Sequence, residues 1–88
     1  MEFTRSEGRI YACDPDGKLL AEVLFPVTDG VASIDRTFVD ETLRGQNIAA
    51  QLLEAAVEQI RQNGWKAKPV CSYAVKWFSK HPEASDLL

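Results

Sequence analysis

The sequence TLRGQNIAAQLL, residues 42–53, leads from the end of a predicted strand into a predicted helix through a short turn rich in glycine and amide side chains. An α-helix cannot supply acceptors for its own first four N–H groups, so these donors are free to bind something else. They also lie at the positive end of the helix dipole, which makes them suited to phosphate. The stretch therefore predicts an anion-binding helix start.

The charge pattern of this helix start points the same way. Residues Gln46 to Leu53 include no Asp or Glu, although the 88-residue chain has 13 acidic and 10 basic residues and a net charge of -3. Carboxylates are normally favoured at a helix start because they stabilise the dipole. Their absence indicates that a ligand supplies the negative charge. The alternative is an exposed helix start that only water satisfies, and the spacing alone does not separate the two.

The same stretch resembles the acetyl-coenzyme A signature of the GCN5-related N-acetyltransferases. In that signature a basic residue or Gln, two variable residues, a small residue, a variable residue, and Gly or Ala wrap the pyrophosphate. Asn47 stands where the family usually has Gly, and Asn is the non-glycine residue that best tolerates left-handed backbone. The resemblance implies that the cofactor is bound by Arg44, Gly45, Gln46, Asn47, Ile48 and Ala49.

Further motifs extend the resemblance over nearly the whole chain, and toward a small single-domain branch of the superfamily that has a Cys near the cofactor. RTFVD looks like the strand end before the signature, with Arg36 where His is common. VCSY, WF and HPE look like the C-terminal half of that branch. These motifs lie at residues 36–40, 70–73, 77–78 and 81–83.

The resemblance implies a single acetyltransferase domain over residues 1–88, with acetyl-coenzyme A as cosubstrate. It also implies that the strand edge at Thr37 and Val39 pairs with the pantetheine arm. The fold expected is the α/β (α+β) arrangement of the GNAT family, in which an antiparallel meander is followed by a strand-helix-strand crossover and a C-terminal helix.

Turn signals and alternating apolar residues predict the meander independently. DPDG is a strong hairpin signal between two apolar runs. In the third strand, Ala32, Ile34 and Phe38 are expected on one face. The expected strands are 9–13, 18–25 and 31–39, with turns at 14–17 and 26–30.

After residue 47 the apolar period becomes helical, and Gly64 is a suitable C-terminal cap. The following strand, 65–70, should run parallel to the third strand, because strand-helix-strand units are right-handed crossovers. Pro69 cannot donate to a ladder, so one edge is expected to be unpaired there. Ser72 is expected to cap a final helix.

Cys71 and Tyr73 are the candidate catalytic residues. Cys71 lies between the last strand and a helix start, a position in which reactive thiols occur, although a small apolar residue at a tight junction is the common alternative. The resemblance favours a place for Cys71 beside the cofactor. It also suggests Tyr73 as the acid that protonates the departing thiolate, whereas a core aromatic with its hydroxyl at the surface is the structural alternative. We expect direct transfer to an amine over an acetyl-cysteine intermediate.

The general base and the acceptor are left open by the sequence. Water, Glu22, Asp35 and Glu41 are equal candidates for removing the amine proton, and a protein amine is one candidate acceptor. His81, the only histidine, is expected only to end a helix. A coenzyme A or acyl-CoA binding module without efficient transfer is the main alternative function, and a purely structural or partner-binding domain is the third.

Composition excludes several other classes. The net charge of -3 and a pI near 5.0 argue against a nucleic-acid partner, because a protein that binds nucleic acid normally displays a basic face. Cys13 and Cys71 form no metal or redox motif. No apolar run approaches membrane-spanning length, so we expect no membrane partner, no metal and a cytoplasmic location.

Overall fold

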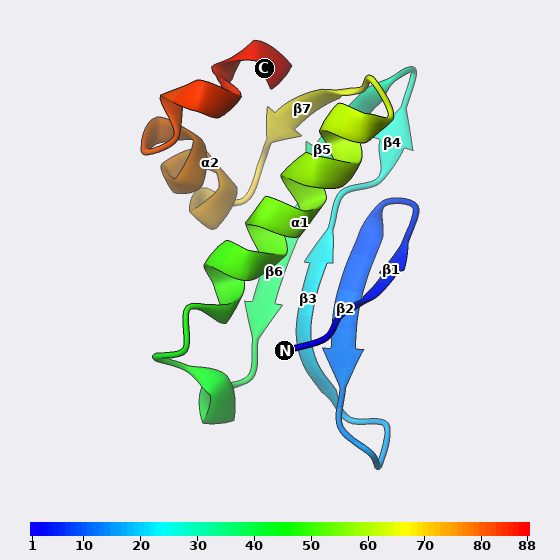
Figure 1. Cartoon of the computed structure of the whole chain (residues 1–88), viewed down its shortest axis with the longest axis vertical. Coiled ribbons are helices and arrows are strands. Elements are labelled where there is room, and N and C mark those ends of the chain that lie inside the picture. The colour runs from blue at the N-terminus through cyan, green and yellow to red at the C-terminus, as the bar shows by residue number, and fades with distance from the viewer.

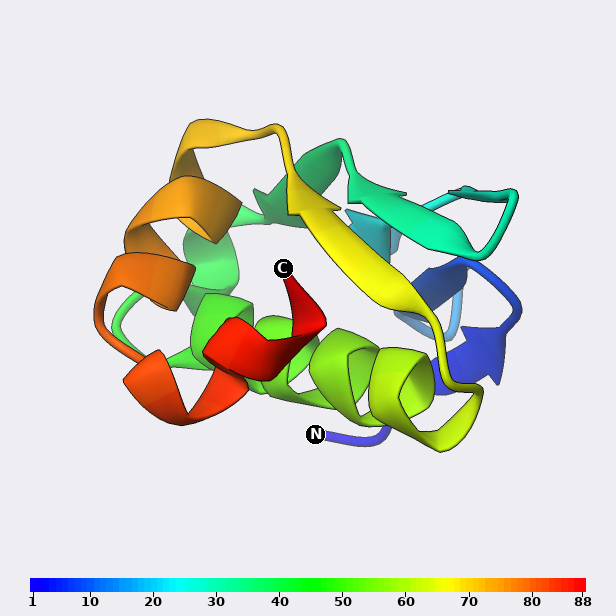
Figure 2. The ribbon, with the colours of Figure 1, turned by 90° about the horizontal axis from the view of Figure 1, so that it is seen from above.

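The computed structural model describes all 88 residues and has two small sheets, with both α-helices and the C-terminal 3-10 helix on one side of the strands (Figures 1 and 2). Strands β1 to β3 and β6 form an antiparallel sheet in the order β1-β2-β3-β6, and the second sheet has the order β4-β5-β7. The strands are β1 Thr4–Ser6, β2 Arg9–Cys13, β3 Leu19–Leu24, β4 Val27–Thr28, β5 Val31–Ile34, β6 Arg36–Val39 and β7 Lys66–Pro69. The helices are η1 Glu41–Leu43, α1 Ile48–Gln62, α2 Ser72–Ser79 and η2 Pro82–Leu87.

The predicted α+β fold is confirmed in its main elements. The hairpin of β2 and β3 forms around the DPDG turn. Strands β5 and β7, which precede and follow α1 in the sequence, pair in parallel. Helix α1 ends at Gln62 with Asn63 as its C-cap, and Gly64 follows with a φ of +70°, the left-handed conformation for which glycine is favoured after a helix.

The core lies between α1 and the strands. The apolar stripe of α1 buries Ile48, Leu52, Leu53, Ala55, Ala56, Val57 and Ile60. Alternate residues of β2 and β3 face this stripe, among them the fully buried Ile10 and Val23. Because each buried Leu or Ile contributes about 1.5–3 kcal/mol, this contact is the main source of stability.

The third predicted strand, 31–39, is wrong as a single element. It is two strands, β5 and β6, that belong to different sheets. At Asp35 the chain changes partner, because the N–H of Asp35 donates to the carbonyl of Leu24 (2.9 Å) while the carbonyl of Ile34 accepts from Val70 and Cys71 (3.1 and 3.0 Å). Alternation of apolar residues continues through the break, so the pattern alone could not reveal it. The expectation that Phe38 shares a face with Ala32 and Ile34 is wrong, because Phe38 pairs with Glu22, next to the core-facing pair of Val23 and Thr37, and so lies on the face away from α1.

Two short strands were not predicted. The segment expected as a turn at 26–30 contains β4, which pairs with β5 through a tight Asp29-Gly30 turn in which both residues have positive φ. Strand β1 is exposed throughout and has no apolar alternation. It is held to α1 by Gln59, whose side chain accepts from Gly8 N and donates to the carbonyl of Ser6, each at 3.1 Å.

Candidate functional site

The turn before α1 presents a continuous run of unpaired backbone donors. Gly45 has a φ of +85°, and Asn47, the N-cap, has a φ of +61° and makes no side-chain cap hydrogen bond. The first helical bond is from Gln51 N to the carbonyl of Asn47 (3.2 Å), and no N–H from Gly45 to Ala50 donates within the chain. The left-handed turn thus leaves these donors available to a ligand.

No carboxylate neutralises this helix start. The first turn of α1 has no acidic residue. Before the turn, Asp40 caps η1, where it accepts from the hydroxyl and the amide of Thr42 at 2.5 and 3.1 Å. These hydrogen bonds lower the pKa of Asp40, and the one from the Thr42 hydroxyl has the larger effect. The first turn of α1 therefore offers no carboxylate of its own to compensate the helix dipole.

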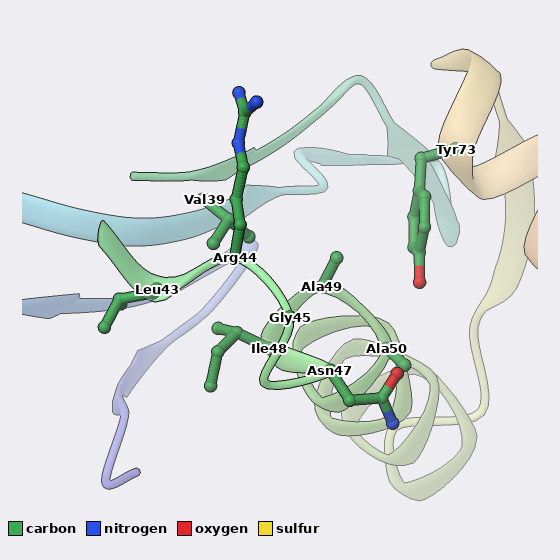
Figure 3. A pocket seen from close by; sticks show the side chains of 9 residues that line it. All are labelled: Val39, Leu43, Arg44, Gly45, Asn47, Ile48, Ala49, Ala50 and Tyr73. Atoms are coloured by element: carbon green, nitrogen blue, oxygen red, sulfur yellow. The ribbon is translucent and has the colours of Figure 1, made fainter. Parts of the chain in front are cut away.

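A cleft of about 180 Å³ lies beside this turn (Figure 3). Tyr73 reaches into it from α2, with its hydroxyl end toward the first turn of α1, whereas the Arg44 side chain extends away from the turn. The lining residues are Val39, Leu43, Arg44, Gly45, Asn47, Ile48, Ala49, Ala50 and Tyr73. The cleft thus joins the unpaired donors to the end of β6 and to a phenol.

Strand β6 provides a second set of backbone groups beside the cleft. It pairs only with β3, and β7 pairs only with β5, so the two sheets separate after Ile34 and Pro69. Asp40 N donates to the carbonyl of Leu20 (2.7 Å), and because backbone direction alternates along a strand, Thr37 and Val39 direct their groups away from β3. The edge of β6 is consequently free to pair with an extended ligand.

Tyr73 is held in its protonated form over a wide pH range. Burial, and secondarily the negative charge of Glu54, raises the pKa of this phenol above its ordinary value. A raised pKa keeps the proton on oxygen to higher pH, so Tyr73 is a neutral donor throughout the neutral range.

The predicted site residues are only partly brought together. Val39, Arg44, Gly45, Asn47, Ile48, Ala49 and Tyr73 line the cleft, and Thr37, Gln46 and Cys71 do not. Leu43 and Ala50, which also line it, were not predicted. The sequence could have indicated them, because they directly flank the signature. A turn that curves around a ligand contacts it with the residues at both ends of the turn.

Cys71 has a structural contact that was not predicted. Its Sγ accepts from Ala74 N (3.4 Å), so Cys71 and not Ser72 is the N-cap of α2, and Ser72 is the first helical residue. Sγ also lies 3.6 Å from the hydroxyl of Thr37 on β6. Cys71 therefore links α2 to the strand whose edge is free.

The cap predicts a stability effect for Cys71. Cys71→Ala should lower the free energy of unfolding by about 1 kcal/mol, as expected for loss of an N-cap, whereas Cys71→Ser should preserve it because Ser is a favourable cap. Urea denaturation of the two variants beside the parent chain measures this. Equal midpoints for Ala and Ser would show that the sulfur contact contributes nothing to α2.

None of the candidate bases lines the cleft. Glu22 is buried and bonded to Arg9, Asp35 accepts from the Ser33 hydroxyl, and Glu41 is exposed in η1.

No group of three or more His, Cys, Asp or Glu side chains is arranged to hold a metal ion. None of the helices is long and apolar enough to cross a bilayer. Both cysteines are free thiols.

Comparison with known proteins identifies the class to which this fold and cleft belong. A family model described as GCN5-related N-acetyl-transferase matches residues 9–87. The chain belongs to the GCN5-related N-acetyltransferase family, and with it to the acetyltransferases. A search of curated proteins found no match.

Solved structures agree with this assignment. A Staphylococcus aureus protein described as GCN5-like is 32% identical, with a TM-score of 0.79 over 98% of this chain and 85% of that one. An Escherichia coli N-acetyltransferase of the family, solved in complex with CoA, is 22% identical with a TM-score of 0.59, over 69% of this chain and 38% of its own. A ribosomal-protein-alanine N-acetyltransferase from Brucella melitensis is 19% identical with a TM-score of 0.62, over 82% of this chain and 59% of its own. The last two support the fold alone.

Proposed function

We propose that the chain, as a single domain over residues 1–88, transfers the acetyl group of acetyl-coenzyme A to an amine, with a protein amine as one candidate acceptor. The observation that carries the proposal is the run of unpaired N–H groups from Gly45 to Ala50 at a helix start without carboxylates. Family membership supports acetyl-coenzyme A as the ligand, because coenzyme A use is general to the family. The expected location is the cytoplasm.

The cofactor contacts follow from the backbone. The pyrophosphate would accept from the N–H groups of the turn, with Arg44, Gly45, Gln46, Asn47, Ile48 and Ala49 as the binding segment. The pantetheine amides would pair with the free edge of β6 at Thr37 and Val39, and the thioester would then lie between β6 and Tyr73. Catalysis in this arrangement comes mainly from positioning and from hydrogen bonds to the thioester carbonyl.

The chemical step needs one proton donor. The amine nitrogen attacks the thioester carbon, the C–S bond breaks, and the departing thiolate takes a proton from the Tyr73 hydroxyl. The proton of the new ammonium group leaves to water or to a carboxylate, and Tyr73 regains its own from solvent. Cys71 remains a second candidate nucleophile, which would carry the acetyl group as a thioester before the amine takes it.

The test is a heteronuclear NMR titration of the chain with coenzyme A. The amides from Gly45 to Ala50 should shift most, followed by those of Thr37 and Val39. Shifts confined to another surface would overturn the proposal.

One observation favours the alternative of a coenzyme A binding module without efficient transfer: no carboxylate or histidine lines the cleft. Turnover of acetyl-coenzyme A with a panel of amines separates the two functions. Binding at the turn together with no turnover above the hydrolysis rate would identify the module.

A further inference from the structure

One face of the β1-β2-β3-β6 sheet lies away from α1 and α2 and is covered by neither of them (Figure 2). The register arranges its side chains in two rows across the four strands. One row is Thr4, Tyr11, Glu22 and Phe38, and the next is Ser6, Arg9, Leu24 and Arg36. We call these eight residues the open face. The alternate residues of the same strands, such as Ile10 and Val23, face α1 and are fully buried.

Glu22 is a charged residue buried on this otherwise open surface. Its side chain is only 6% exposed. The Arg9 Nε donates to the carboxylate at 2.6 Å, and an Arg36 terminal nitrogen lies 3.9 Å from its other oxygen. Two guanidinium groups thus share one carboxylate, and the open face retains a net positive charge on a chain whose overall charge is -3.

Most hydrogen-bond donors of the two arginines are unused. Arg9 bonds only through Nε, and Arg36 makes no hydrogen bond, since its distance to Glu22 is too long for one. The side chains remain 41% and 54% exposed. A planar guanidinium with free terminal nitrogens binds a carboxylate with two parallel hydrogen bonds.

Aromatic rings hold both guanidinium groups in place. The Arg9 guanidinium carbon lies 3.8 Å from the centre of the Tyr11 ring, and that of Arg36 lies 5.3 Å from the centre of Phe38. Stacking restricts these long side chains before a ligand arrives, which lowers the entropy lost on binding. Half-buried Leu24 lies between them and adds an apolar contact.

We propose that the open face docks an acidic polypeptide segment, whose Glu or Asp side chain binds Arg36 and Arg9 and whose apolar side chain covers Leu24. Arg9 and Arg36 together carry one positive charge more than Glu22 balances, and one carboxylate of a ligand would neutralise it. A phosphate backbone fits less well, because repeated phosphates would lie near the Glu22 carboxylate. A second copy of the chain fits less well too, because a two-fold contact would place the arginine rows against each other.

The test is an NMR titration of the full chain, without coenzyme A, using short synthetic peptides rich in glutamate and leucine. The matched probes are the same peptides with glutamine in place of glutamate. We expect the amides of Tyr11, Glu22 and Phe38 to shift with the glutamate peptides, and binding of the glutamine peptides to be about tenfold weaker. Raising the salt concentration should reduce this preference.

Three variants examine the role of charge. Arg36→Gln should weaken binding of the glutamate peptide about tenfold and leave the Arg9–Glu22 pair intact, and Arg36→Lys should recover part of the loss. Arg5→Gln is the control, because it makes the same charge change at an exposed residue whose register partner, Ile10, faces the core.

Equal binding of glutamate and glutamine peptides, or an unchanged affinity in Arg36→Gln, would overturn the inference. Tighter binding of a single-stranded oligonucleotide to the open face would do so as well. Shifts that grow with protein concentration alone would assign the face to self-association. Because coenzyme A takes no part, failure here leaves the proposed function intact, and failure of coenzyme A to bind residues 45–50 leaves this docking face intact.

Discussion

Gly45→Asp is expected to weaken coenzyme A binding about a hundredfold. A carboxylate at this turn would lie where a pyrophosphate approaches the free N–H groups. Two like unit charges 4 Å apart repel each other by about 1 kcal/mol in water and by about 4 kcal/mol at a partly buried site. A repulsion between these two values raises the dissociation constant about a hundredfold. Isothermal calorimetry with coenzyme A measures the change.

The control for Gly45→Asp is Gly45→Ala. Both variants place a Cβ on a residue with a φ of +85°, and a Cβ there meets no atom within 4 Å, so the two share backbone strain without a steric clash. Only Asp adds charge. Thermal unfolding of both variants reports the shared cost. If Ala weakens binding as much as Asp, the loss comes from backbone conformation and not from an anion site.

Tyr73→Phe is expected to lower kcat about a hundredfold while the KM for acetyl-coenzyme A changes little. The phenol donates a proton only as the C–S bond breaks, and general acids typically contribute about a hundredfold or more. Because burial raises the pKa of Tyr73, ionisation of this phenol should not reduce the activity of the parent chain below about pH 10, the ordinary value for Tyr. Steady-state kinetics with a saturating amine measures both effects.

Cys71→Ser is the companion variant, because it retains the cap of α2. It should keep most of the activity if the amine attacks the thioester directly. The opposite ranking, with Cys71→Ser inactive and Tyr73→Phe active, would contradict direct transfer. A single acetyl group on Cys71 in the intact mass, removed when an amine is added, would then make Cys71 the nucleophile.

The fold was predictable wherever one segment carried its own signal. The stripe of α1, the DPDG hairpin and Gly64 each depend on local chemistry, and the structure confirms all three. The division of 31–39 into two strands depends on hydrogen bonds to Leu24 and to Val70, which lie far apart in the sequence. No local pattern encodes such a change of partner.

The candidate site was predictable to the same extent. The left-handed backbone at Asn47 agrees with the residue type found there, because Asn tolerates positive φ. The cap at Cys71 was assigned to Ser72, since Ser is the commoner cap and a sulfur acceptor leaves no distinct sequence pattern. The open face was missed because its rows exist only once four strands are aligned across the sheet.

The break at Asp35 also affects how the protein can change in evolution. The donors that would hold the cofactor belong to peptide groups of the turn and of the β6 edge, so among substitutions only a replacement by proline removes one of them directly. Affinity would be lost through changes that alter the path of the backbone, such as a bulky β-branched residue at Gly45 or Asn47, or a substitution that lets β6 and β7 close the gap between them. Side-chain changes elsewhere on the surface would therefore leave this set of backbone donors in place.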